Sequence, residues 1–303
     1  MNPMVPFWIA FGAAGLAAYP VYRTLIRTNT RQTVSEFAPE SHQKKQGTPT
    51  MGGLIVVIGL LVALAYPSDS AWISWLVLVV GMAAIGFLDD WVVPRRWPGK
   101  RGLGWKQKLA MQVVVAVPAA YLFPLTRQDP LHVGLFALAV LFTANAYNFV
   151  DGLDGLAGSI GLLLALGLGS LAAGSSMTAV MAGALVPFLV LNAPPAKVFM
   201  GDVGSLPIGA VLGGLGYASA VLAGDASGVV AVVVLALVLI IELVPVPLQI
   251  FWVKVFKKRL FPYTPIHHAF EKAGWPESRV VWLFAIAQAV CVAGAWTLGW
   301  RTV

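Results

Sequence analysis

Long apolar runs alternate with short polar stretches along the whole chain. A helix needs about 20 consecutive apolar residues to cross the hydrocarbon core of a bilayer, and ten runs approach that length. The pattern therefore predicts an all-α polytopic membrane protein, one integral membrane domain over residues 1–303, with about ten transmembrane helices. These are expected at residues 5–25, 51–66, 71–88, 108–123, 132–149, 155–173, 177–193, 204–222, 228–253 and 280–299.

Composition agrees with this interpretation. The chain is 58% apolar and 11% charged, with a mean hydropathy of +0.80, whereas a soluble domain carries about 25% charged residues. The net charge of +7 comes from basic residues that lie between apolar runs, so it indicates topology and no nucleic-acid partner. Cys291 is the single cysteine, which excludes an intramolecular disulfide and a cysteine-rich metal site.

Basic residues fall almost entirely on alternate sides of the predicted spans. Of the 20 Lys and Arg residues, only Arg127 and Arg301 lie in even-numbered connections or beyond the tenth run. Because basic loops mark the cytoplasmic side, both termini are expected outside and the odd-numbered connections inside.

Five aspartates gather at the predicted cytoplasmic ends of the spans: Asp89, Asp90, Asp151, Asp154 and Asp202. The adjacent pair repel each other and call for a cation or a shared proton. Each aspartate alone is typical of a solvated helix cap, but such a cluster in a membrane protein favours a functional site.

Asparagines and glycines accompany these aspartates. If the helix continues past residue 150, Asn145 and Asn148 share a face with Asp151 and Asp154. Carboxylate and amide oxygens suit Mg²⁺, which keeps phosphates or waters in its remaining positions. The chain has no P-loop, zincin or nucleophile-elbow motif. A membrane enzyme that acts on a lipid phosphate is therefore predicted.

Two further segments carry candidate phosphate ligands. In "KKQGTPTMGGL", Lys45 offers a point charge and Thr50 a hydroxyl at a helix start, although a tightly packed start of a helix explains the segment equally well. In the last predicted cytoplasmic loop, His267 and His268 suit a phosphate better than zinc.

One acid and several glycines favour structural roles. Glu242 lies well inside a span; it either lines a site or, as we favour, holds a neighbouring helix by a hydrogen bond. Pro245 and Pro247 should kink that span. The glycines of residues 209–213 indicate close helix packing rather than a nucleotide loop.

Five motifs, in order, resemble the prokaryotic polyprenyl-phosphate N-acetylhexosamine-1-phosphate transferases. They are "KQGTPTMGG", "FLDDW", "NAYNFVDGLDGLAG", "NAPPAKVFMGDVGSL" and "PIHHAFEKAGWPE". "TPTMGG" and the His-His-x-Phe-Glu stretch favour the branch that transfers phospho-MurNAc-pentapeptide. That branch commonly has a third histidine where this chain has Ala269, so a role for a third imidazole is in doubt here.

The resemblance implies a reaction and a setting. UDP-MurNAc-pentapeptide and undecaprenyl phosphate would give undecaprenyl-diphospho-MurNAc-pentapeptide (lipid I) and UMP, with Mg²⁺ as cofactor. The family fold has ten transmembrane helices with both termini outside, in the bacterial cytoplasmic (inner) membrane, and members are often homodimers.

The resemblance also implies residue roles. Asp202 would be the Mg²⁺ ligand, with Asp89 and Asp90 facing the metal and the lipid phosphate. The acceptor phosphate has a second pKa of about 6 and is mostly ionised at pH 7, so charge screening by Mg²⁺ and Lys45 should outweigh any base catalysis by Asp89. Phosphate ligands would be Lys45, His267 and His268; nucleotide and diphosphate ligands Asn145, Asn148, Asp151 and Asp154; and uridine contacts Asn192 and Phe199, the latter by stacking.

Three rivals differ from this prediction. The nearest is a GlcNAc-1-phosphate transferase to a polyprenyl phosphate, which only donor choice distinguishes. A transporter would need coupling acids deep in the membrane, and only Glu242 is deep. A scaffold would have no use for five aligned polar motifs.

Overall fold

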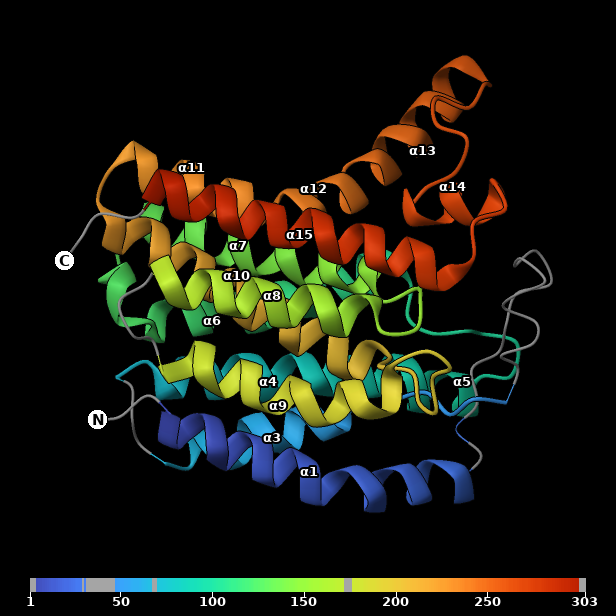
Figure 1. Ribbon diagram of the computed structural model, residues 1–303, viewed down its shortest axis with the longest axis horizontal. Coiled ribbons are helices and arrows are strands. Elements are labelled where there is room, and N and C mark those ends of the chain that lie inside the picture. The colour runs from blue at the N-terminus through green and yellow to red at the C-terminus, as the bar shows by residue number, and fades with distance from the viewer. Residues whose placement is uncertain (1–3, 29, 31–46, 67–69, 172–175, 300–303) are drawn as a thin grey trace.

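The computed structural model describes residues 4–28, 30, 47–66, 70–171 and 176–299. Apolar α-helices account for most of them (Figure 1). The main helices are α1 (Met4–Arg27), α3 (Leu54–Leu64), α4 (Trp72–Phe87), α6 (Trp105–Leu122), α7 (Pro130–Val150), α8 (Leu156–Leu171), α9 (Ser176–Asn192), α10 (Asp202–Ala223), α11 (Ala226–Leu235), α12 (Leu237–Leu243), α13 (Pro245–Phe256) and α15 (Glu277–Gly299). Shorter helices are η1 (Leu88–Val92), α5 (Val93–Arg96), η2 (Pro124–Thr126) and α14 (His267–Lys272).

Every predicted apolar run coincides with one or more of these helices, which confirms an all-helical membrane fold. Within the described ranges, six helical segments are long and apolar enough to cross a bilayer, and α3, α8, α9 and α11 are shorter apolar helices. The six segments are Met4–Arg27, Trp72–Arg96, Pro130–Val150, Asp202–Ala223, Leu237–Phe256 and Glu277–Leu298.

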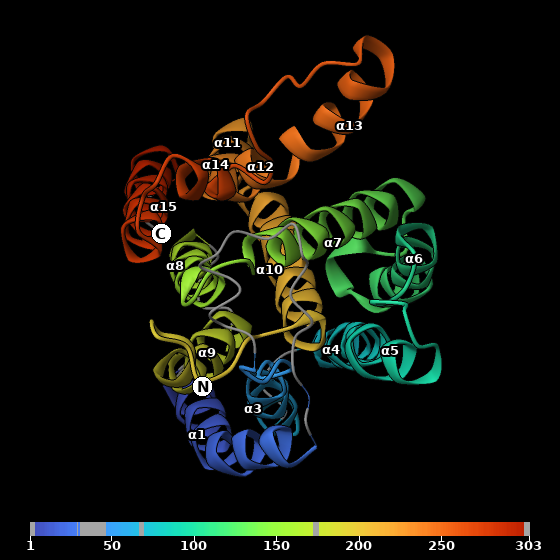
Figure 2. The same ribbon diagram turned by 90° about the vertical axis from the view of Figure 1, so that its right-hand side faces the viewer.

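Helix α10 lies at the centre of the bundle, surrounded by α3, α4, α7, α8 and α9 (Figure 2). Its glycines allow other backbones to approach closely: a Cβ added to Gly209 would lie 2.6 Å from the carbonyl oxygen of Thr143 on α7. At Gly53, near the start of α3, an added Cβ would lie 2.9 Å from the carbonyl oxygen of Met200. The glycines of α10 are therefore packing residues, as the sequence predicted.

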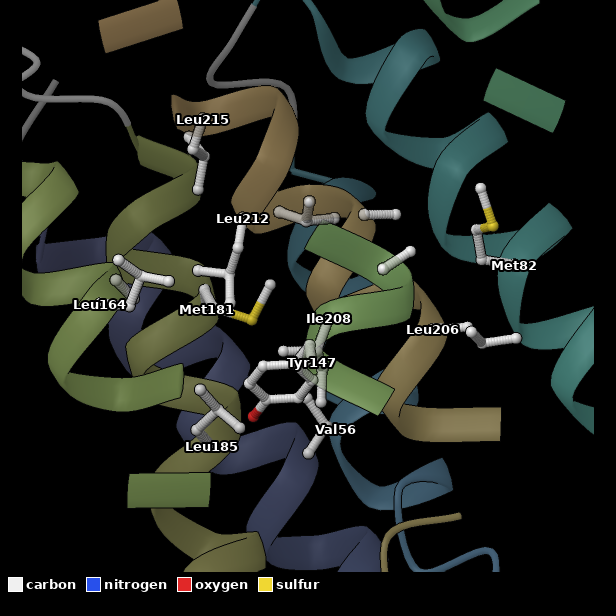
Figure 3. Close-up of a cluster of buried hydrophobic side chains, with 14 of the residues drawn as sticks. Val56, Met82, Tyr147, Leu164, Met181, Leu185, Leu206, Ile208, Leu212 and Leu215 are labelled. Carbon is white, nitrogen blue, oxygen red and sulfur yellow. The ribbon is translucent and has the colours of Figure 1, made fainter. Parts of the chain in front are cut away.

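Tyr147 lies in a cluster of buried side chains, among Leu185, Ile208 and other apolar residues (Figure 3). Its ring is fully buried, and its hydroxyl donates a hydrogen bond of 2.6 Å to the carbonyl oxygen of Ala157. Since Tyr147 comes from α7 and Ala157 from α8, this bond fixes the two helices together across the loop that carries Asp151 and Asp154.

The ninth apolar run is broken twice. It forms α11, α12 and α13, which are separated at Ala236 and Val244. Proline cannot donate the backbone hydrogen bond of a helix interior, and the second break immediately precedes Pro245. As a result α13 leaves the bundle and projects from it (Figures 1 and 2), so the predicted kink is confirmed.

The start of α1 and the end of α15 lie at one end of the bundle, and α5 and α14 lie at the other (Figure 1). The second end also holds the close of α4, the close of α7 and the start of α10, where the aspartates are. The start of α1 and the end of α15 therefore lie opposite the acidic residues, while the side of the membrane that each end faces stays a prediction.

Candidate active site

Asp89 and Asp90 sit in η1, a π-helical turn that continues α4. Such turns contain one residue more than an α-turn and often occur at functional sites. Asp89 accepts a 2.7 Å hydrogen bond from the Leu103 N–H, whereas Asp90 accepts one of 3.1 Å from the Val203 N–H. The two neighbours thus reach different backbone partners, one before α6 and the other on α10.

Asp202 joins this pair from the first residue of α10. Its carboxylate accepts hydrogen bonds from Lys108 Nζ at 2.5 Å and from Asn148 Nδ2 at 2.7 Å. Lys108 Nζ lies 3.1 Å from the carboxylate of Asp89, and Asn148 also donates to Ser205 Oγ at 2.8 Å. Residues from α4–η1, α6, α7 and α10 therefore meet at one point.

The three carboxylates offer the ligands of a cation site. One oxygen each from Asp89, Asp90 and Asp202 lies within 4.8 Å of the others, and all three side chains are partly exposed. Hard oxygen ligands that leave room for water or phosphate match what Mg²⁺ takes in proteins. The donor set therefore fits Mg²⁺, with Lys108 balancing part of the negative charge.

Lys108 is the residue of this site that sequence reasoning missed. It counted only as one of the basic residues that indicate topology. A detectable signal existed: Lys108 begins the predicted span 108–123, so its charge lies at the start of an apolar run rather than in the loop. Its partner Asp202 is 94 positions away, and pattern analysis does not connect them.

Asp151 lies beside the cluster, just after α7. Its carboxylate accepts a 3.1 Å hydrogen bond from the N–H of Gly201, the residue before Asp202. Burial, and then the negative charges of Asp202 and Asp90, raise the pKa of Asp151 well above its usual range. This carboxyl group is therefore held where added positive charge would stabilise its ionised form.

The shared face of Asn145, Asn148, Asp151 and Asp154 required a helix that continues past residue 150, and this condition is not met, because α7 ends at Val150. The chain turns through Gly152 and Gly155, and the latter has a φ of +78°. Asp154 is buried and accepts a 2.9 Å hydrogen bond from the Ala196 N–H. Asn145 donates to Gln112 at 2.7 Å. Only Asn148 and Asp151 contact the acidic cluster or its backbone directly.

Backbone hydrogen bonds join the TPTMGG segment to the start of α10. Phe199 N–H donates to the Pro49 carbonyl at 2.9 Å, and Gly52 N–H donates to the Phe199 carbonyl at 2.7 Å. This pairing places the Thr50 hydroxyl next to Gly201, where an added Cβ would lie 2.9 Å from Thr50 Oγ1. Lys45 lies outside the described residues.

Asn192 is buried and hydrogen-bonded to the backbone on either side of it, at Gly155 and Val198. The side chain is 2% exposed, its oxygen accepts from the Gly155 N–H at 3.0 Å and its amide donates to the Val198 carbonyl at 2.9 Å. The bonds tie the loop after α7 to the segment that carries Phe199. The ring of Phe199 itself is partly exposed.

The two histidines begin the short helix α14, which lies in the predicted connection between the ninth and tenth spans. His268 Nδ1 lies 2.6 Å from Glu271 Oε2. His267 is fully buried. The carboxylate of Glu242 accepts a hydrogen bond of 3.1 Å from the backbone N–H of His267 and contacts Nδ1 of the His267 ring at 2.8 Å. The prediction that Glu242 holds a neighbouring helix by hydrogen bonding is confirmed.

Comparison with known proteins assigns the chain to a family. The chain is 40% identical over 307 residues to the phospho-N-acetylmuramoyl-pentapeptide-transferase of Moorella thermoacetica, covering 92% of this chain and 93% of that protein. It is 35% identical over 321 residues to the protein of that name from Picosynechococcus, covering 94% and 85%. The chain belongs to this transferase family.

Two family descriptions match parts of the same chain. Residues 45–57 match signature 1 of the phospho-N-acetylmuramoyl-pentapeptide-transferases. Residues 72–220 match glycosyl transferase family 4. The first region contains Thr50, and the second contains Asp89, Lys108 and Asp202, so the matched regions contain the residues that meet at the acidic site.

Proposed function

We propose that the protein transfers phospho-MurNAc-pentapeptide from UDP-MurNAc-pentapeptide to undecaprenyl phosphate, releasing UMP and forming lipid I. This would be the first membrane step of peptidoglycan synthesis. The observation that carries the proposal is the meeting of Asp89, Asp90, Asp202 and Lys108 at one end of an apolar helical bundle. It occurs in a chain that is similar to these transferases over more than nine tenths of its length.

The setting belongs to the same proposal. The acidic end of the bundle would face the cytoplasm, with ten spans, both termini outside and a homodimer in the bacterial cytoplasmic membrane. The 18 basic residues that lie in the odd-numbered connections or at the span ends beside them support this orientation. A water-soluble nucleotide sugar would reach the site from the cytoplasm and the lipid acceptor from the bilayer.

The transfer itself is a displacement at phosphorus. An oxygen of the acceptor phosphate forms a bond to the sugar-linked phosphorus of the donor, while the bond from that phosphorus to the UMP oxygen breaks. Mg²⁺, when held by Asp202 with Asp89 and Asp90 nearby, supplies charge neutralisation to the diphosphate and the leaving group. Since the acceptor is mostly ionised at neutral pH, with a pKa of about 6, little proton removal is required.

The residues of this chain then have separate tasks. Lys108 would hold Asp89 and Asp202 in place and offset charge when two anionic substrates approach. Asn148 would orient Asp202, and Asp151 would hold the backbone at Gly201. Lys45, Thr50 and His268 remain proposed phosphate contacts, and Phe199 remains the proposed ring for uracil stacking.

A donor comparison tests the proposal. Purified protein in detergent with Mg²⁺ and undecaprenyl phosphate should release UMP from UDP-MurNAc-pentapeptide and accumulate the lipid-linked diphosphate product. UMP release without lipid product would indicate hydrolysis and contradict transfer. Transfer from UDP-GlcNAc alone would move the protein to the GlcNAc-1-phosphate branch.

A further inference from the structure

Glu242 and His267 form a buried pair outside the acidic cluster. Both side chains are 0% exposed, Glu242 lying on α12 and His267 on α14. A carboxylate can only accept hydrogen bonds, so the contact of 2.8 Å between Glu242 Oε2 and His267 Nδ1 places a proton on Nδ1. The second oxygen is used by the backbone N–H of His267. Glu242 therefore fixes both the orientation of the ring and the nitrogen that carries the proton.

The other ring nitrogen faces the active-site loop. Nε2 of His267 is buried and has no hydrogen-bond partner among the described residues. It points at Gly152, where an added Cβ would lie 2.5 Å from it. A buried polar atom without a partner is costly, and its ring packs against a backbone position that only glycine fits. The unpartnered Nε2 is therefore the cost of a contact that holds the loop at Gly152 in one place.

A continuous set of contacts leads from this pair to the acidic cluster. His267 packs against Gly152, which follows Asp151. Asp151 in turn accepts the 3.1 Å hydrogen bond from Gly201, which precedes Asp202. A displacement of His267 would therefore move Asp151 and, through Gly201, the first residue of α10.

We propose that Glu242 is a positioning residue that sets, through His267 and Gly152, where Asp151 and Asp202 lie for catalysis. The inference rests on the proposed transfer function and extends it to a residue buried in α12. It also assigns His267 a positioning task in place of direct phosphate binding, because its Nδ1 is engaged by Glu242 and its Nε2 is closed off by Gly152.

Glu242→Gln tests the electrostatic part of this arrangement with little change of shape. Glutamine offers one accepting oxygen and one donating amide. If the oxygen keeps the His267 N–H, the amide faces Nδ1, which must then accept, and the ring proton moves to Nε2 against Gly152. We expect kcat to fall about 10- to 100-fold, the range for a misplacement of about 1 Å.

A double-mutant cycle separates positioning from general damage. Gly152→Ala should lower kcat to a similar degree. The kcat of the double variant should be within about threefold of the kcat of the less active single variant, since both substitutions act on one contact. The matched control is Gln288→Leu, which removes another fully buried polar side chain, bonded to the Leu235 carbonyl. It should lower the melting temperature and leave kcat within about twofold of the parent.

An independent readout does not depend on activity. Nitrogen-15 NMR of labelled histidine should show a protonated Nδ1 on His267 in the parent protein and a shifted Nδ1 signal in Glu242→Gln. Parent-like kcat in Glu242→Gln, or losses that multiply in the double variant, would overturn the proposal. If the parent transfers no sugar phosphate, the proposed function fails, while the NMR result still decides whether Glu242 controls His267. If Glu242→Gln does not fold, Gly152→Ala is the substitute test. It should shift the ring nitrogen signals of His267, and unchanged signals would refute the contact between His267 and Gly152.

Discussion

Lys108 Nζ lies 2.5 Å from a carboxylate oxygen of Asp202, although the two residues are 94 positions apart in the chain. The same ammonium group lies 3.1 Å from Asp89. The ammonium group of Lys108 therefore connects the start of α6 to η1 and α10. The acidic cluster is held together by a positive side chain as well as being a candidate site for a positive ion.

Removing that side chain should disable the site. Lys108→Met keeps much of the length but leaves Asp89 and Asp202 to repel each other. We expect kcat to fall about 100- to 1,000-fold, as for the loss of a preorganised charged group. Steady-state UMP release measures this. Lys106→Met is the control, because Lys106 is exposed on the same helix and lies 5.5 Å from the Trp105 ring centroid. A loss in both variants would indicate damage to α6.

Asp202→Asn should weaken metal binding. The substitution removes one of three negative carboxylates and keeps one accepting oxygen, so the side chain can still accept from Asn148 or from Lys108 but not from both, since they bond different oxygens of Asp202. We expect at least a tenfold higher Mg²⁺ concentration for half-maximal activity, a loss of about 1.4 kcal/mol or more. Asp154→Asn, at a buried aspartate bonded to Ala196, should leave the Mg²⁺ requirement unchanged. An unchanged requirement in Asp202→Asn would refute the metal assignment.

The pH dependence of Asp89→Asn distinguishes positioning from base catalysis. Asp89 is hydrogen-bonded to Leu103 and paired with Lys108, so we expect its loss to lower activity by the same factor from about pH 6 to 9, as the acceptor phosphate goes from about half ionised to almost fully ionised. Rate profiles of the variant and the parent measure that factor. A loss that disappears as pH rises would instead identify Asp89 as a base.

Asp151→Asn should stabilise the protein at neutral pH when no divalent cation is present. The folded state raises the pKa of Asp151 well above its usual range, so it favours the protonated carboxyl. The contribution of this protonated carboxyl group to the free energy of unfolding is fully present below the unfolded-state pKa of about 3.9. It is lost as pH rises toward the folded-state pKa. Asparagine carries no charge and avoids this loss. Melting temperatures should show a gain that is large at about pH 7 and small at about pH 4.

The magnitude of that gain follows from linkage. Each unit of pKa difference corresponds to ~1.4 kcal/mol. A gain that is equal at all pH values would mean that the hydrogen bond from Gly201, and not the charge, governs the effect. Added Mg²⁺ should reduce the gain, because a bound cation stabilises the ionised carboxylate of the parent.

The sequence was informative wherever one strong local signal decided the outcome. Apolar runs located the helices because burial from water is the dominant requirement of each span, and Pro245 located a break because proline cannot donate a backbone hydrogen bond. The aspartates at helix ends were also evident, since charged residues are rare in such a chain.

The sequence was least informative where several weak preferences compete. The end of α7 at Val150 separates Asp154 from Asn148, and it depends on turn geometry at Gly152 and Gly155 that periodicity does not encode. The contacts of Lys108 with Asp202 and of His267 with Glu242 depend on how distant helices pack. The helical start at His267 likewise reflects packing against a buried acid rather than local propensity.

The π-turn at η1 has a consequence for how the chain can change in length. An α-helix advances about 100° per residue, so the one additional residue in this turn rotates everything after it relative to α4. That rotation brings Asp90 to Val203 and sets Arg95 over the Trp91 ring at 3.1 Å, with a hydrogen bond of 3.0 Å to the Thr28 carbonyl. Deleting Leu88 would restore an ordinary helix and turn Asp89, Asp90 and Arg95 out of phase with α4. Both aspartates would then remain in the sequence while the site was lost.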